Sequence, residues 1–324
     1  QFRTTIPVEQ DQTKLLAILG HLATKGSANQ FSNEEWLKQL ASRINLSASS
    51  VNTYLACKYK FLLRHIFRIP TAISERLEYG NAVHTALERY FKIWMEEATD
   101  KPPQKQILLD LFEQQMRVKA LTEDRIHFHT VKGVEELSGY YDAFFSTWIS
   151  PLDIERQIGR SGGVQLDEIP LNGKIDRLEI IDSESKTVRI IDYKTGRPKT
   201  DGEIEGSTKN SEGETKRQLV FYALLLSLDT SFKHTVSEAM VSFIRKDEGT
   251  HAHREYVWKV NDAEIEELKQ TIKKIYSSVQ NLEFDRTTDL KICKNCDFIN
   301  HCWPEGLPTF DPQAQQEQLS FQED

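Results

Sequence analysis

The chain has 324 residues, enough to bury one elaborated core or two smaller ones. Its net charge of −8 argues against a protein that coats nucleic acid non-specifically, because such binding needs Lys and Arg to neutralise phosphates, although a local basic channel remains compatible with it. No apolar run approaches transmembrane length, and the first residues lack a charged-then-apolar signal pattern. We therefore expect a cytoplasmic protein.

The N-terminal part reads as helices joined by linkers. Apolar residues recur at helical spacing over 10–22 and 33–44, with a linker-like stretch between them. A further helix follows, with Ser47 or Ser49 as its cap and Cys57 inside it. A lone cysteine there would be a buried structural residue, so its meaning depends on the cysteines at the far end of the chain.

Three helices are expected next, over 74–98, 104–120 and 134–149. The first carries His84, and Gly80 one turn earlier allows another segment to approach closely. A histidine on an amphipathic helix is more often a structural residue than a ligand, so His84 alone does not identify a site. The other two helices read as scaffold.

A β-rich region begins with an expected strand over 151–157. It carries Glu155, a carboxylate that could join a site on the sheet, although we expect a strand glutamate to face solvent. An antiparallel hairpin follows, with strands over 173–181 and 187–194 joined by the polar segment 182–186.

The hairpin register brings two aspartates together. If the loop is symmetric, Asp176 lies opposite Asp192, and Lys174 lies opposite Lys194. Residues two apart on a strand share a face, so Asp176, Asp192 and Lys194 point the same way. Opposed residues have Cβ atoms about 4.5–5.5 Å apart. Two carboxylates this close at the end of an apolar face repel each other unless a cation lies between them, and a divalent ion with oxygen ligands is the natural choice.

The remaining charges of the hairpin allow two interpretations. Lys194 cannot bind a cation as an ammonium, but it can contact an attacking water or a charged oxygen beside one. On the opposite face, Glu179 and Arg189 are expected to form a solvent-exposed pair. A lone D-x-K pattern is common by chance, so a surface hairpin with scattered charges is the alternative.

Polar residues continue into the second half of the chain. The stretch 195–213 is interpreted as a disordered surface loop, with a mobile substrate flap as the alternative. A helix over 214–228 places Gln218 and Tyr222 four residues apart on one face, where both need polar partners, either structural or at a functional site. Two strands and a helix are expected after it: 238–246, 251–260 and 262–279.

The sequence CKNCDFINHC follows this helix. It contains Cys293, Cys296 and Cys302, and Cys57 is the only other cysteine of the chain. In a cytoplasmic chain this spacing indicates a metal site rather than disulfides. Four thiolates suit zinc or an iron–sulfur cluster, and His301 is an alternative zinc ligand, so the spacing leaves the metal open. Either site would join the N- and C-terminal segments and contribute to folding.

Five motifs occur in order along 46–304. They are GNAVH around His84, GKIDR around Asp176, IDYKTG around Asp192 and Lys194, the Q-x3-Y pair Gln218 and Tyr222, and the split cysteine set. Together they resemble the RecB-like branch of the PD-(D/E)xK nucleases, in the iron–sulfur form of AddB-type recombination nucleases and CRISPR-associated exonucleases. Residues 1–7 also resemble the end of a UvrD-like helicase core.

The resemblance implies a fold and a division of the chain. The fold would be α/β, a restriction-endonuclease-like mixed central sheet flanked by helices, with the N- and C-terminal segments joined by a four-cysteine metal cluster. The nuclease domain would span 46–304. A helical or linker segment, which could be the end of a helicase region, would precede it over 1–45, and a disordered tail would follow over 305–324.

The resemblance also implies roles for individual residues. Mg²⁺ or Mn²⁺ would be held by four groups: His84, Asp176, Asp192 and the carbonyl of Tyr193. Lys194 would orient or activate the attacking water, while Gln218 and Tyr222 would support the site and the DNA strand. A [4Fe–4S] cluster, with zinc as the alternative, would be bound by the four cysteines: Cys57, Cys293, Cys296 and Cys302.

The function implied is a Mg²⁺- or Mn²⁺-dependent deoxyribonuclease. It would act on single-stranded DNA or DNA ends during recombination and double-strand break repair, together with a helicase domain or subunit and without a membrane. The alternative is a non-catalytic iron–sulfur or zinc module that binds DNA within a helicase complex.

Overall fold

The structure is a computed structural model that describes residues 30–159, 163–209 and 211–307. The helix expected over 10–22 and the tail from 308 lie outside the described residues. The chain divides into two compact units: one has the described residues up to Asn52 and Ile73–Glu283, and the other has Thr53–Ala72 and the described residues from Phe284. None of the described helices has the length and apolar character that a membrane crossing requires.

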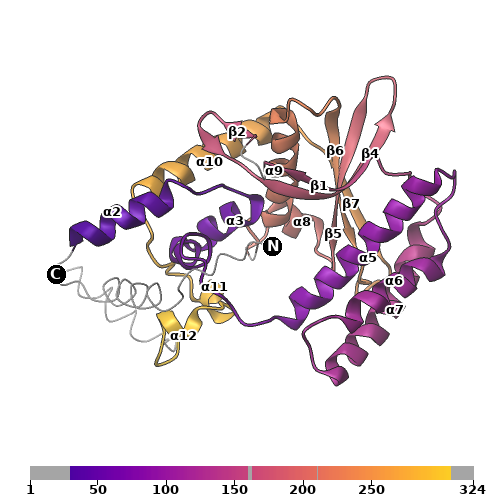
Figure 1. Cartoon of the computed structure of the whole chain (residues 1–324), viewed down its shortest axis with the longest axis horizontal. Helices are drawn as coiled ribbons and strands as arrows, with labels where there is room; N and C mark the ends of the chain where they lie inside the picture. The colour runs from indigo at the N-terminus through magenta and orange to yellow at the C-terminus, as the bar shows by residue number, and fades with distance from the viewer. Residues whose placement is uncertain (1–29, 160–162, 210, 308–324) are drawn as a thin grey trace, which may run out of the picture. The chain divides into compact units, whose positions relative to one another are not determined.

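The larger unit is built on a mixed five-stranded sheet with the order β1-β4-β5-β6-β7 (Figure 1). Its strands are β1 (Asp153–Ile158), β4 (Gly173–Asp182), β5 (Thr187–Lys194), β6 (Thr235–Phe243) and β7 (Arg254–Lys259). Only β5 and β6 are parallel among its neighbouring strands, and helix α9 (Glu214–Leu228) lies in the connection between them. A separate pair, β2 (Gln165–Leu166) and β3 (Ile169–Pro170), precedes β4. The expected α/β class is therefore confirmed.

The hairpin register expected from the sequence is confirmed. β4 and β5 pair with Arg177 opposite Ile191, the register that places Asp176 opposite Asp192 one step further along. The backbone ladder ends at Arg177, so the two aspartates lie where the strands separate. A separating pair of strands leaves room between the backbones for side chains.

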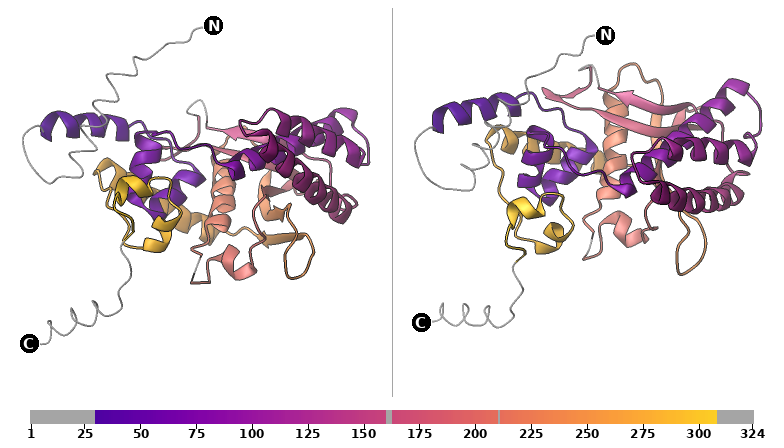
Figure 2. Two further views of the ribbon diagram at one scale, coloured as in Figure 1. Left: turned by 90° about the horizontal axis from the view of Figure 1, so that it is seen from below. Right: turned by 60° about the horizontal axis from the view of Figure 1, so that its bottom comes forward.

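Helices α5 (Glu75–Glu97), α6 (Lys105–Arg117) and α7 (Glu123–Phe144) lie side by side in Figures 1 and 2 and share one apolar core with the sheet. α5 and α6 match the expected helices. α7 begins well before the expected start because its early inner face is formed by His129 and Gly133 rather than by large apolar residues. A Cβ on Gly133 would lie 2.2 Å from the Phe112 ring, so glycine is what lets α7 approach α6.

The face of the sheet that these helices cover carries a buried ion pair. Arg177 and Glu179 contact each other and are 1% and 2% exposed. The Arg177 guanidinium also donates to the Tyr193 hydroxyl at 3.0 Å and lies over the Phe91 ring, 4.1 Å from its centre. The prediction that Glu179 faces solvent with Arg189 was wrong, because residues far away in the sequence cover a face that looks polar on the strand itself.

The other face of the sheet is covered by α9, against which α10 (Asp262–Gln280) packs. Both helices match the expected ranges, as does α2 (Gln30–Ala41). The stretch 195–213, expected to be a disordered loop, contains the short helix α8 (Asp201–Glu205), so that prediction was wrong there. Thr200 and Glu203 form a capping box that satisfies the backbone at the start of α8.

The smaller unit consists of short helices from both ends of the described chain. The helix expected to run through Cys57 stops before it: α3 (Ala48–Ala56) ends, and Cys57, in an extended conformation, caps α4 (Lys58–Phe61). A π-helical segment, η1 (Leu62–Ile66), continues α4. The C-terminal segment adds α11 (Leu290–Lys294) and α12 (Ile299–Cys302). The Tyr59 N–H donates to the Asp285 carbonyl at 3.1 Å, which joins the two segments.

Candidate active site

The centre of the site is the end of the β4–β5 hairpin. Asp192, which is 2% exposed, has its Oδ2 atom 2.8 Å from the Lys194 ammonium. The Asp176 Oδ2 atom accepts a hydrogen bond from the Tyr193 N–H at 2.9 Å. The side chain of Asp176 thus takes the place of a backbone partner where the ladder ends. Because the N–H and C=O of one strand residue point to the same side, the Tyr193 carbonyl faces the Asp176 side of β5.

Helix α9 supplies the polar partners of Lys194 and Asp192. Gln218 accepts a hydrogen bond from the Lys194 ammonium at 2.7 Å and donates its amide to Asp192 Oδ1 at 3.0 Å. The same amide donates to the Tyr222 hydroxyl at 2.8 Å. The helix approaches β4 closely at Gly173, where a Cβ would lie 2.5 Å from Leu225 Cδ1. The Q-x3-Y spacing therefore places both side chains in one network with the hairpin.

Helix α5 brings His84 to the same place. Its Nδ1 atom lies 3.3 Å from Asp176 Oδ2. One turn earlier, a Cβ on Gly80 would lie 3.3 Å from the hydroxyl oxygen of Thr195, the residue after Lys194. The glycine therefore allows the close approach that the sequence indicated, and it lets the histidine reach the hairpin.

Glu155 of β1 completes the group. His84, Glu155 and Asp176 each offer a ligand atom, and these three atoms lie within 4.8 Å of one another. The expectation that Glu155 faces solvent was wrong, since only 6% of its side chain is exposed. In the β1–β4 register Glu155 lies opposite Asp176, so both share a face. Its φ of +54°, rare for a residue with a side chain, marks a strained backbone at this position.

The pairing of β1 with β4 is the signal that would have identified Glu155 from the sequence. A strand over 151–157 that precedes the hairpin as its neighbour puts one residue opposite Asp176. The segment between the two strands includes the small β2–β3 pair, which hides the register from inspection of the sequence.

The two aspartates are held in different electrostatic states. Burial would raise the pKa of Asp176, but the charge of His84 and hydrogen bonds from His84 and the Tyr193 N–H outweigh it, and the pKa lies below its ordinary value. Burial holds the pKa of Asp192 above its ordinary value; Lys194 opposes this shift and the Asp176 carboxylate reinforces it. The pKa of His84 is raised because the Asp176 carboxylate outweighs the effect of burial. Two buried carboxylates that repel in this way favour a cation between them.

The donor set fits a hard divalent ion. Two buried oxygens, Glu155 Oε2 and Asp192 Oδ2, accept no hydrogen bond of good geometry from the described residues, and each contacts a lysine ammonium instead. Carboxylate and carbonyl oxygens with one imidazole suit Mg²⁺ or Mn²⁺. The residues present could therefore hold such an ion where His84, Glu155 and Asp176 converge.

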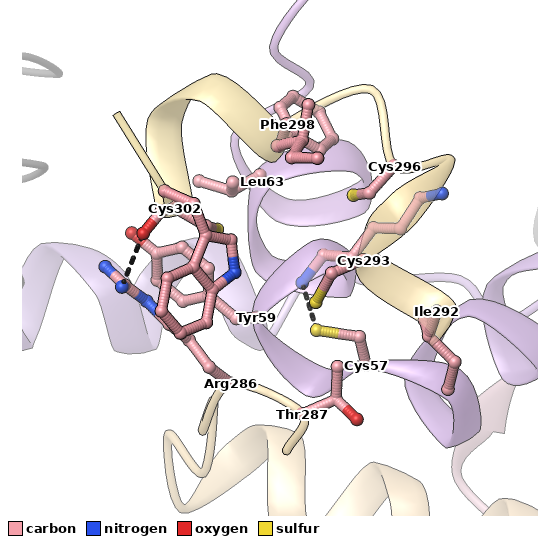
Figure 3. A pocket seen from close by; sticks show the side chains of 13 residues that line it. Cys57, Tyr59, Leu63, Arg286, Thr287, Ile292, Cys293, Cys296, Phe298 and Cys302 are labelled. Atoms are coloured by element: carbon pink, nitrogen blue, oxygen red, sulfur yellow. Dashed lines mark hydrogen bonds between the residues drawn. The ribbon is translucent and has the colours of Figure 1, made fainter. Parts of the chain in front are cut away.

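The smaller unit gathers all four cysteines of the chain around one pocket. Figure 3 shows Cys57 of one segment and Cys293 and Cys296 of the other pointing into it, with Tyr59 and Arg286 at the side of Cys302. None of the four is in a disulfide. Arg286 donates to the Cys302 carbonyl at 3.1 Å and lies over the Tyr59 ring, so it links the two segments.

The pocket is not arranged as a ready zinc site. Around one zinc, with Zn–S bonds of about 2.3 Å, tetrahedral thiolates stand roughly 3.8 Å apart. Within the described residues, no three thiols come within 4.8 Å of one another. The Nε2 atom of His301, the alternative zinc ligand, instead lies 3.0 Å from the Tyr59 hydroxyl. Burial raises the pKa of the Cys302 thiol to about 11.

Comparison with known proteins agrees with this geometry. The family model for the PD-(D/E)XK nuclease superfamily matches residues 45–303. The B component of an ATP-dependent helicase/deoxyribonuclease from Carboxydothermus hydrogenoformans is 26% identical over 216 residues, which are 59% of this chain and 19% of that protein. The chain thus spans about a fifth of the length of this curated relative.

A solved structure supports the fold. It is a candidate exonuclease from Eubacterium rectale, which aligns with a TM-score of 0.51 at 15% identity and covers 90% of this chain and 98% of its own. At this identity the likeness concerns the fold alone. The family model covers most of the chain and includes the hairpin, α5 and α9. The chain belongs to the PD-(D/E)XK nuclease superfamily.

Proposed function

We propose that this chain is a Mg²⁺- or Mn²⁺-dependent deoxyribonuclease that hydrolyses phosphodiester bonds of single-stranded DNA or of DNA ends. One observation carries the proposal: four separate elements, α5, β1, the β4–β5 hairpin and α9, converge their polar side chains on the point where the hairpin opens. A surface hairpin with scattered charges would not bury these groups or link them by hydrogen bonds.

The ligands of the ion are proposed to be His84, Asp176, Asp192 and the Tyr193 carbonyl, with Glu155 added from the structure. When bound, the ion would polarise the scissile phosphate and lower the pKa of the attacking water. His84, held 3.3 Å from Asp176, orients that carboxylate from the side of α5. The Tyr193 N–H fixes the same carboxylate from β5.

Lys194 is proposed to act on the attacking water and on the phosphate. Its ammonium is fixed between Asp192 and Gln218, at 2.8 and 2.7 Å, and a third N–H remains for another acceptor. Hydrolysis forms a bond from the water oxygen to phosphorus, breaks the bond to the leaving sugar oxygen, and moves one proton from the water to the leaving group. A fixed ammonium stabilises the negative charge that develops on the phosphate oxygens.

Gln218 and Tyr222 are proposed to position Lys194. Gln218 contacts both partners of the ion pair, and Tyr222 holds the Gln218 amide. The two side chains also line an open hollow beside the site, which makes them candidates for contact with the DNA strand.

The cysteine pocket is proposed to bind a [4Fe–4S] cluster, with zinc as the less favoured alternative. In a four-iron cluster each thiolate binds a different iron atom, so the sulfur atoms stand farther apart than around one zinc. Thiols that share a pocket without gathering around a single point suit the larger group better. Work with a helicase domain or subunit, in recombination and double-strand break repair, is proposed from the relative's name.

The function is tested with Asp192→Ala. With Mn²⁺ and a labelled single-stranded oligonucleotide, cleavage should fall by about 10²–10³-fold or more, because a buried carboxylate of the ion site is lost. Binding of the oligonucleotide should stay within about twofold. The matched control is Glu184→Ala in the loop of the same hairpin, which should cleave as the unchanged chain does.

Two outcomes would contradict the proposal. If the unchanged chain, loaded with Mg²⁺ or Mn²⁺, cuts no DNA, the non-catalytic DNA-binding module becomes the better interpretation. If Asp192→Ala cuts as fast as the Glu184 variant, the chemistry lies elsewhere in the molecule.

A further inference from the structure

Lys174 occupies an unusual place beside the proposed ion site. Its ammonium contacts the Oε2 atom of Glu155, one of the three convergent ligand groups. Only 6% of the Glu155 side chain is exposed, whereas half of the Lys174 side chain is. A buried carboxylate needs a positive partner. In the structure as it stands, Lys174 supplies this charge.

The same lysine forms the ridge between two open hollows. Lys174 and its cross-strand partner Gln157 line both of them. One hollow, of about 500 Å³, contains Gln218 and Tyr222 of the site. The other, of about 520 Å³, contains Glu88 and Lys92 of α5 and the β1 residues on either side of Glu155. A strand of DNA lying over the site would fill the two hollows and cross this ridge.

Glu155 cannot serve two cations equally at once. An ion bound by His84, Glu155 and Asp176 competes with the Lys174 ammonium for the same oxygen. The lysine side chain has a long flexible stem and is half exposed, so it can turn away without disturbing β4. A lysine released on the ridge between two hollows would meet a phosphate of the strand that crosses it.

We propose that Lys174 is a metal-responsive phosphate clamp: it neutralises Glu155 when no ion is bound and contacts a DNA phosphate once a divalent ion has taken Glu155. The proposal rests on the proposed nuclease function and adds to it a residue for substrate binding. It couples the two ligands, since the ion and the DNA each favour the same position of Lys174. By linkage, the ion must strengthen DNA binding by the factor with which DNA strengthens ion binding.

The first test measures the ion without DNA. In Lys174→Met, titration calorimetry with Mn²⁺ should give binding about two- to fivefold tighter than in the unchanged chain, because a competing half-exposed ion pair is gone. Lys174→Arg should bind as the unchanged chain does. The matched control is Lys92→Met: Lys92 pairs with Glu88 at 2.6 Å in the second hollow, but Glu88 is outside the convergent group.

The second test measures DNA in a Lys194→Ala background, which lacks the lysine proposed to act on water but keeps every proposed ligand. Binding of a single-stranded oligonucleotide should strengthen on addition of Mn²⁺. With Lys174→Met added, that gain should shrink, and the slope of log affinity against log salt in Mn²⁺ should fall by about 0.7, the contribution of one phosphate contact on a single strand. Without Mn²⁺ the two proteins should bind equally.

The outcomes separate the clamp from the function on which it rests. If the unchanged chain binds Mn²⁺ but Lys174→Met binds it no more tightly, or loses DNA affinity equally with and without Mn²⁺, the clamp is wrong and the ion site stands. If the unchanged chain binds no Mn²⁺ at all, the ion site and the clamp are both wrong.

Discussion

The sheet site and the cysteine pocket are held together in different ways. The sheet site stands on long elements with a shared apolar core, and its side chains already hydrogen-bond one another. The cysteines instead stand on or beside helices of four or five residues, and all four are half-buried. Helices this short do not persist by themselves in water. We infer that the sheet site is organised before any ion binds, whereas the smaller unit depends on its metal.

The largest expected effect breaks the smaller unit only. Cys296→Ser, or removal of the iron by a chelator, should abolish amide protection over 53–72 and 284–307, because a structural metal can supply about 10 kcal/mol of folding free energy. The strands β4 and β5 should keep their protection. Hydrogen–deuterium exchange read by mass spectrometry measures both regions at once, with Asn295→Ser as the control. Equal protection of the smaller unit in both variants would remove the contrast between the two regions.

A second variant tests the claim that the sheet unit is held by its own contacts. Glu179→Ala leaves the Arg177 guanidinium buried without its partner, which should cost about 3–5 kcal/mol in the free energy of unfolding. The control is Glu238→Ala, since the pair of Glu238 with Arg189 at 2.6 Å is partly exposed and worth up to about 1 kcal/mol. Denaturant titration at fixed metal content compares them. Similar costs would mean that Glu179 is not the buried charge described here.

The smallest effect concerns ion affinity alone. Glu155→Gln keeps the shape of the side chain but loses its charge, and should weaken Mn²⁺ binding about tenfold, or about 1.4 kcal/mol, with little change in stability. Glu88→Gln, one turn beyond His84 on α5, is the matched control and should bind Mn²⁺ normally. Titration calorimetry decides between them. A Glu155 variant with unchanged affinity would return the site to the four groups expected from the sequence.

The sequence predicted the hairpin and the Gln218–Tyr222 pair because both depend on local periodicity. Alternation along β4 and β5 and a spacing of four along α9 fix which side chains share a face, whatever the rest of the chain does. The confirmed register of β4 with β5 follows from the short loop between them. His84 belongs with these only through the motif around it, since a histidine on a helix says little by itself.

The residues that sequence reasoning misplaced depend on distant segments. Glu155 is buried because β1 pairs with β4, and Glu179 is buried because α5 to α7 cover its face. Neither strand shows this in its own pattern, because both residues are charged. The helix α8 differs, since Thr200 and Glu203 show the spacing of a capping box that the sequence displays openly.

The composition of the smaller unit has a consequence for how the protein is made. Cys57 leaves the ribosome long before Cys293, and more than two hundred residues, including the whole sheet, are synthesised between them. The first thiol must therefore wait for the last three, and closing so long a loop becomes easier once the sheet has already folded. Loading of the proposed cluster would then be a late step in biosynthesis, and a chain that carries its iron would be one whose translation through the sheet is complete.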